Sequence, residues 1–256
     1  MTAIAFAVSD SRTMIRRVLK HTMRNPSTLL MAILLPLILL MLMDYGFGGA
    51  LNTGGIKYIN YVVPGIIMMG AGYSASATAV AVNSDMSEGI IDRFRTLAIS
   101  RGSVLIGHVV GNTLRTAAGA VVVILAALGM GFRPTGSPVR WVEVAGLVLL
   151  LLFAVSWLAT AMGLAANNAS AAASMASLIT FLPFLSGAFV PTSTMPSWLR
   201  SFTANQPMTH IIDTLRGLMM GTSVGDHGWI SLAWCVGITL VAYMWAKSVF
   251  SKKTVR

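Results

Sequence analysis

The densest group of ionisable side chains lies in residues 83–101, which read NSDMSEGIIDRFRTLAISR. The chain has 18 basic and 8 acidic residues, and six of these 26 fall within that one stretch, namely Asp85, Glu88, Asp92, Arg93, Arg95 and Arg101. A helix over residues 89–97 would carry an apolar face made of Ile90, Ile91, Phe94 and Leu97. A short helix of mixed charge with such a face suits the docking of a partner protein. The alternative is a solvated loop.

The residues that commonly do chemistry are not arranged for catalysis. The sequence has no Gly-x-x-x-x-Gly-Lys-Ser/Thr phosphate loop, so we expect no nucleotide site of that type. Its four histidines are scattered, with no acidic residue at ligand spacing, so we expect no metal site. Gly72-Tyr73-Ser74-Ala75-Ser76 and His210 are the pieces that an intramembrane serine protease would need. The motif lacks its second glycine, however, and small residues in a span usually pack helices.

Arg115 is the basic residue that lies deepest in an apolar run. Burying a charge at the centre of a membrane helix costs at least ~2.5 kcal/mol, so such a residue is by default a functional hypothesis. The other interpretation is that Arg115 extends toward the interface or pairs with a neighbour. Both interpretations stay open at this point.

Composition indicates what must position these residues. Hydrophobic residues make up 55% of the chain and charged residues 10%, with a mean hydropathy of +0.76, whereas soluble domains carry roughly 25% charged residues. The chain is therefore predicted to be an all-α polytopic membrane protein. Its net charge of +10 reflects basic cytoplasmic loops rather than nucleic-acid binding. The single cysteine, Cys235, excludes a disulfide framework within the chain.

Apolar runs of about 20 residues, enough to cross a ~30 Å hydrocarbon core, predict six spans in one transmembrane domain, 1–256. These spans are 28–46, 58–82, 104–130, 141–165, 172–190 and 229–248. Residues 83–103 form the loop between spans two and three. Residues 191–228, broken by prolines, are predicted as short external or re-entrant helices.

Residues 9–25 precede the first span and alternate with a helical period. The predicted amphipathic helix lies in the membrane interface, with its basic residues near lipid headgroups, and these are Arg12, Arg16, Arg17, Lys20 and Arg24. With both termini in the cytoplasm, the inner segments hold twelve basic residues and the outer ones five. This asymmetry supports that orientation and places residues 83–103 in the cytoplasm.

Two blocks of the sequence resemble the membrane subunits of ABC-2-type exporters, in particular the daunorubicin-resistance (DrrB-like) permeases of bacteria. The first is EGIIDRFRTLAISR at residues 88–101, followed by Gly107. The second and more specific block is SGAFVPTSTMPSWLR at residues 186–200, which continues to NQPMT at 205–209 and TLRG at 214–217.

This resemblance implies a permease in the bacterial inner membrane that works with a separate ATPase subunit and a second permease copy. ATP and Mg²⁺ would bind to the ATPase, and this chain would hold no cofactor. The loop between spans two and three would be the coupling helix, with the ATPase contacts Glu88, Gly89, Asp92, Arg93, Phe94, Arg95 and Arg101. The amphipathic helix at 9–25 would be the elbow helix.

The resemblance also implies an amphiphilic cargo, either a drug or a lipid-like molecule, that moves along a path beside spans one, two and five. The candidate path residues are Met68, Met69, Tyr73, Arg115, Phe181 and Phe184. A self-contained secondary transporter is the alternative function. The sequence disfavours it, because no span carries the chain of acidic residues or histidines that a proton relay needs.

Overall fold

The structure is a computed structural model, and it describes residues 12–18, 20, 26–51, 55–87 and 101–254. All regular secondary structure within these residues is helical. The described part of the chain therefore has the all-α character that its composition predicts.

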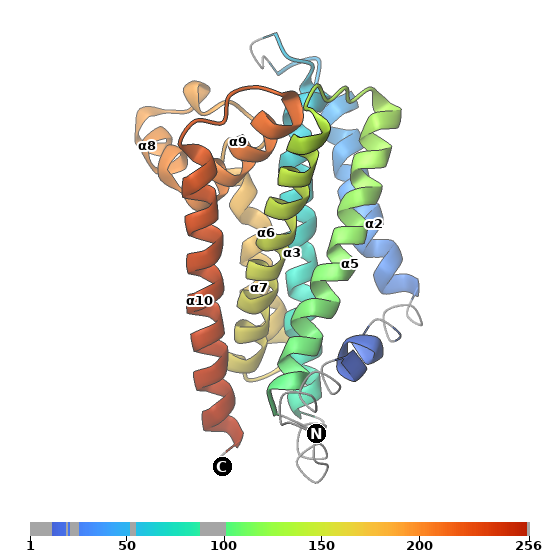
Figure 1. The fold of residues 1–256 in the computed structure, drawn as a ribbon, viewed down its shortest axis with the longest axis vertical. Coiled ribbons are helices and arrows are strands. Elements are labelled where there is room, and N and C mark those ends of the chain that lie inside the picture. Colours follow the sequence, from blue (N-terminus) through green and yellow to red (C-terminus); the bar gives the residue numbers. More distant parts are fainter. Residues whose placement is uncertain (1–11, 19, 21–25, 52–54, 88–100, 255–256) are drawn as a thin grey trace.

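Four helices are long and apolar enough to cross a membrane within the described residues. They are α3 (Tyr58–Ser87), α5 (Arg101–Met130), α6 (Pro138–Ala165) and α10 (His227–Thr254), and they run along one another in Figure 1. A helix of 30 residues, such as α3, is about 45 Å long and exceeds the ~30 Å hydrocarbon core. The chain is a polytopic membrane protein on this ground.

Two shorter apolar helices occupy the regions of predicted spans one and five. The first is α2 (Pro26–Met41), which continues as the π-helical turn η1 (Leu42–Phe47). The other is α7 (Ala169–Phe181), followed by the 3₁₀ turn η2 (Leu182–Leu185). The sequence predicts a span over 172–190, and within it α7 ends at Phe181, two residues before Pro183, which cannot donate to the helical ladder. The count of six spans remains a prediction.

The long helices also extend into the predicted loop at 83–103. Helix α3 includes residues up to Ser87 and α5 includes residues from Arg101, so both helices contain residues of the predicted loop. Asp85, which the sequence places in that loop, lies within α3, and its carboxylate has partners on neighbouring elements.

Glycines allow α3 to approach its neighbours closely. A Cβ atom on Gly72 would lie 2.6 Å from the Cα of Thr180 in α7. One on Gly163 of α6 would overlap the backbone oxygen of Ala79. Because lipid tails are as apolar as the helices, close packing and interhelical hydrogen bonds stabilise such a bundle more than hydrophobic burial does.

The two ends of the bundle carry different elements. Helices α8 (Ser197–Asn205) and α9 (Pro207–Met220) lie together at one end, hereafter the α8–α9 end (Figure 1). They fall, with the short turn η3 (Thr192–Thr194), inside the segment 191–228 for which the sequence predicts short helices. Residues 12–18 and the end of α10 lie at the opposite end (Figure 1).

Candidate functional site

A cluster of polar side chains joins α3, α5 and α6 inside the bundle. Ser74 of α3 donates to the Oδ1 of Asn112 at 2.7 Å, and the Nδ2 of Asn112 donates to the Oγ of Ser156 in α6 at 2.8 Å. Thr116 donates to the Oγ of Ser74 at 2.5 Å. Asn112 and Thr116 stand four residues apart and so share one face of α5. These residues together with Arg115 are called the polar cluster below.

Arg115 is hydrogen-bonded to neutral partners alone among the described residues. Its Nη2 donates to Asn112 at 2.7 Å and to Ser74 at 3.2 Å, while its buried Nε has no partner. It stands halfway along α5, roughly 20 Å from either helix end at 1.5 Å per residue. The structure shows an inward-facing guanidinium that pairs with its neighbours and does not extend to the interface, and a functional role of Arg115 remains a prediction.

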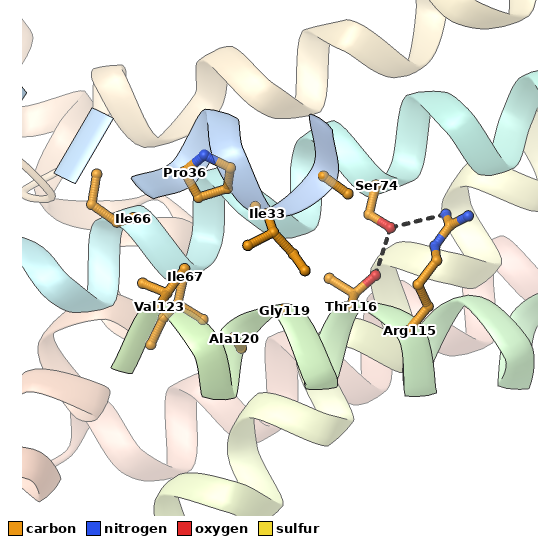
Figure 2. A pocket seen from close by; sticks show the side chains of 12 residues that line it. Ile33, Pro36, Ile66, Ile67, Ser74, Arg115, Thr116, Gly119, Ala120 and Val123 are labelled. Atoms are coloured by element: carbon orange, nitrogen blue, oxygen red, sulfur yellow. Dashed lines mark hydrogen bonds between the residues drawn. The ribbon is translucent and has the colours of Figure 1, made fainter. Parts of the chain in front are cut away.

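An apolar pocket begins at the polar cluster and extends between α2, α3 and α5. It is a narrow and partly open groove, and the empty volume of about 410 Å³ along it includes space outside the protein. Figure 2 shows Ser74, Arg115 and Thr116 at one end of the pocket, whereas Ile66 and Val123 lie at the other. The pocket is thus polar at one end and apolar along its length.

The candidate path residues from the sequence have different positions, and apart from Arg115 none of them lines this pocket. Met68 and Met69 belong to the buried core, and Tyr73 is partly exposed. Phe181 and Phe184 are 60% and 45% exposed, respectively. Their role in a substrate path remains a prediction.

Sequence reasoning missed Asn112 and Thr116 as functional candidates. The available signal was their spacing around Arg115 on an otherwise apolar helix. The sequence also offered Ser74 as a protease nucleophile with His210 as its base. In the structure, Ser74 is hydrogen-bonded to other residues of the polar cluster, and His210 pairs with His227. The described geometry therefore contains no Ser74–His210 pair.

At the end opposite α8 and α9, Asp85 connects three elements. Its carboxylate lies 3.3 Å from a guanidinium nitrogen of Arg17 and 3.0 Å from the Nε2 of His108 in α5. Arg17 belongs to the helical residues 12–18, which fall in the predicted elbow helix. Arg12, Arg16 and Lys20, the other described basic residues of this helix, are exposed.

Residues 12–18 pack on a glycine surface of α5. A Cβ on Gly107 would lie 2.6 Å from the Cβ of Met14, and one on Gly111 would lie 2.6 Å from a methyl group of Val18. Met14 is accordingly 5% exposed. The absence of two side chains on α5 therefore creates the seat for this short helix.

Most of the predicted ATPase contacts fall where no geometry is described. Arg101 is the first residue of α5. The remaining ones, and Arg24 of the predicted elbow helix, lie outside the described residues, so these assignments stay predictions. The residues concerned are Glu88, Gly89, Asp92, Arg93, Phe94 and Arg95.

At the α8–α9 end, Arg216 connects α9 to two other segments. Its guanidinium pairs with Asp213 at 2.5 Å and donates to the backbone oxygens of Tyr61 at 3.2 Å and Gly187 at 2.8 Å. It also lies 3.7 Å over the centre of the Tyr61 ring. Burial raises the pKa of Asp213, and the positive charge of Arg216 opposes this rise.

Two histidines form a further contact between α9 and α10. The Nδ1 atoms of His210 and His227 are 2.8 Å apart, so one must donate and the other accept. Burial, followed by the proximity of His227, lowers the pKa of His210, while Asp213 opposes this shift. The geometry requires that at least one of the two rings is neutral.

Comparison with known proteins identifies the family. The ABC-2 type transporter family matches residues 10–220. The chain is 31% identical over 258 residues to the daunorubicin resistance ABC transporter permease protein DrrB1 of Streptomyces coeruleorubidus, an alignment that covers 99% of this chain and 87% of that one.

More distant relatives agree. The chain is 24% identical to the probable doxorubicin resistance ABC transporter permease protein DrrC of Mycobacterium tuberculosis, over 91% of this chain and 85% of the relative. It is 26% identical to the putative transport permease ycf38 of Porphyra purpurea, over 84% and 75% of the two chains. These matches confirm the resemblance found in the sequence, and the chain belongs to the ABC-2 type transporter family.

Proposed function

We propose that this chain is the membrane-spanning permease subunit of an ATP-driven exporter that moves amphiphilic molecules out of the cell. The observation that carries this proposal is the similarity to an ABC transporter permease along 99% of the chain. ATP and Mg²⁺ would bind to a separate ATPase subunit, since the sequence of this chain has no phosphate loop. A second permease copy and membrane lipids would complete the assembly.

The proposed arrangement has six spans in a bacterial inner membrane, with both termini in the cytoplasm. In support, residues 12–18 and the end of α10 lie at the same end of the bundle (Figure 1). The α8–α9 end would then face outward. The basic residues of the elbow helix would lie among the headgroups of the inner leaflet.

The proposed coupling uses the two helices that the segment 88–100 connects in the chain. Asp85, two residues before the end of α3, contacts His108 of α5 and Arg17. A displacement of the segment by the ATPase would therefore be transmitted to α3, α5 and residues 12–18 together. This movement would change the pocket between α2, α3 and α5, where we place a candidate binding site for the cargo.

Reconstitution tests the proposal directly. The chain is co-purified with its ATPase subunit in proteoliposomes, and ATP-dependent movement of a fluorescent amphiphile across the bilayer is followed. We expect movement that requires ATP and stops when the ATPase carries an inactivated phosphate loop. Movement that continues without any ATPase would contradict the proposal and favour a secondary transporter.

A charge-reversal variant tests the coupling segment. Asp92→Arg combined with Arg93→Asp keeps the net charge but exchanges the signs at two predicted ATPase contacts, so we expect loss of transport with normal membrane insertion. Lys252→Glu reverses the charge of an exposed residue near the end of α10 and is the control for a charge reversal elsewhere in the chain. Equal transport by the double variant and the control would show that these two residues do not form the coupling contact.

A further inference from the structure

The positive charge of Arg115 has no counter-charge within the described residues. The described acidic residues lie near helix ends or in the α8–α9 region, and two of them already have partners, as Asp85 contacts Arg17 and His108 and Asp213 pairs with Arg216. Those acidic residues are Asp44, Asp85, Glu143, Asp213 and Asp226. An inward-facing guanidinium near the middle of a span is therefore balanced by neutral dipoles alone, which is an expensive arrangement.

The guanidinium also retains donors that the protein does not use. Both of its hydrogen bonds within the described residues come from Nη2. Nη1 makes no such bond and is not among the buried atoms without a partner. Because the five N–H donors of arginine form a planar fork that matches carboxylate and phosphate groups, the guanidinium can bind an anionic group that approaches the polar end of the pocket.

The shape of the pocket fits the remainder of an amphiphile. It extends along α3 from Ser74 to Ile66 and along α5 from Arg115 to Val123, which is eight residues on each helix and roughly 12 Å at 1.5 Å per residue. The lining beyond the polar cluster is apolar and includes Ile33 and Pro36 of α2 (Figure 2). A short acyl or aryl body would lie there.

One glycine widens the pocket. Gly119 lines it, and a Cβ atom on this residue would find nothing within 4 Å. A larger side chain at this position would thus enter empty space rather than clash with another helix. This makes Gly119 a site at which the pocket can be filled while the fold is preserved.

We infer that this pocket binds amphiphiles with an anionic headgroup, a carboxylate or a phosphate, and discriminates against cationic ones. The headgroup would accept hydrogen bonds from the guanidinium of Arg115, and the apolar body would extend toward Val123. This inference rests on the proposed function in so far as the ligand is the cargo. A resident membrane lipid offers the same chemistry and is the other source of such a ligand.

The first test measures binding by the purified chain in nanodiscs of neutral phosphatidylcholine. The probes are two fluorescent amphiphiles with the same twelve-carbon chain, one ending in a carboxylate and the other in a trimethylammonium group. We expect the carboxylate probe to bind about tenfold more tightly, as one charge contact in a partly screened site allows. Equal affinities in the wild-type chain would overturn the inference.

Variants identify the residue responsible. Arg115→Gln keeps a hydrogen-bonding side chain and should abolish the preference, whereas Arg115→Lys should retain most of it. Gly119→Leu should weaken binding of both probes, and Gly129→Leu is its matched control, because a Cβ on Gly129 of the same helix also has nothing within 4 Å but lies outside the pocket. A preference that persists in Arg115→Gln, or full binding by Gly119→Leu, would contradict the site.

Transport with the ATPase distinguishes the two sources of the ligand. ATP-driven movement of the carboxylate probe, lost in Gly119→Leu and retained in Gly129→Leu, supports the site as part of the cargo path. Binding without ATP-driven movement upholds the anion site with a resident lipid as its occupant, and counts against the proposed export function. Movement of both probes at equal rates, unchanged in Arg115→Gln, upholds export and overturns the inference.

Discussion

Arg216 provides the sharpest test of how the α8–α9 end is held to the bundle. The perturbation is Arg216→Met, which keeps the length of the side chain and removes its charge and donors. In the structure this guanidinium pairs with Asp213 at 2.5 Å, bonds to two backbone oxygens that belong to α3 and to the segment after α7, and lies over the ring of Tyr61. The Arg216 side chain is 13% exposed, so water would not replace these contacts fully.

The magnitude follows from these contacts. Each hydrogen bond from a charged donor contributes about 1.5 kcal/mol or more, and a cation over an aromatic ring contributes about 1 kcal/mol. The desolvation that arginine no longer requires offsets part of this loss. Removal of one partner of a buried ion pair typically costs about 3–5 kcal/mol, and since the Asp213 side chain is 33% exposed we expect the lower part of this range, about 3 kcal/mol.

The assay is the free energy of unfolding in mixed detergent micelles, measured for Arg216→Met, Asp213→Asn and the double variant. The double-mutant cycle should show a coupling energy of about 1–3 kcal/mol. Arg200→Met is the control, because Arg200 makes its hydrogen bonds to Ser193 and Met195, within its own short segment, and should cost less than about 1 kcal/mol. A loss below about 1 kcal/mol for Arg216→Met, or strictly additive single variants, would refute the reasoning.

Two further predictions concern the two ends of the bundle. Gly107→Val places a Cβ 2.6 Å from that of Met14, so we expect residues 12–18 to detach from α5 and to become cleavable by protease. Gly129→Val is the control, because its Cβ meets no neighbour and digestion should stay unchanged. Equal digestion of the two variants would contradict the packing of residues 12–18 on α5. The pKa of His210 is lowered from its ordinary value of 6.5, so the folded protein disfavours the protonated form of this residue. The stabilisation from the contact with His227 should therefore be complete above pH 6.5 and be lost as the pH falls through the lowered pKa. Hydrogen exchange in α9, corrected for its intrinsic pH dependence, should therefore become faster at pH 5 than at pH 7.5 in the wild type but not in His227→Gln, and an equal response in both would exclude the histidine pair as the cause.

The sequence allowed the prediction of those features that depend on local pattern and composition. Apolar runs located the long helices, and the prolines between 191 and 228 indicated short ones, where α8 and α9 are found. Helix ends were less predictable. Asp85 is a charged residue beside an apolar run, so the sequence places it in a loop. In the structure it lies within α3 and contacts Arg17 and His108, two residues that are distant in sequence.

The partners of Arg115 could not be predicted for a similar reason. The sequence shows a cation inside an apolar run, and whether it extends to the interface or pairs with a neighbour depends on where the side chain points. That direction depends on the rotation of α5 relative to α3, which brings Asn112 within hydrogen-bonding distance of Ser74. Because this rotation is a tertiary property, periodicity within one helix does not determine it.

Two sets of polar contacts between α3 and α5 would carry a displacement from one end of the bundle to the pocket. In the first set, Asp85 contacts His108 near the connection between the helices. In the second, Ser74 contacts Asn112 and Thr116. Ser74 precedes Asp85 by eleven residues of α3, which is about 16 Å along the helix. A hydrogen bond weakens steeply with distance and angle, so α3 and α5 cannot slide past each other by a fraction of a turn without breaking one set or both. The pair of helices is therefore expected to move as one rigid unit or to change in a discrete step.

If the two helices move as one unit, the pocket changes where this unit meets α2. In the second case, a discrete step, the polar cluster itself rearranges and releases the guanidinium of Arg115. Disulfide cross-linking of α3 to α5 at positions beside their polar contacts distinguishes the two cases, because it blocks only the second.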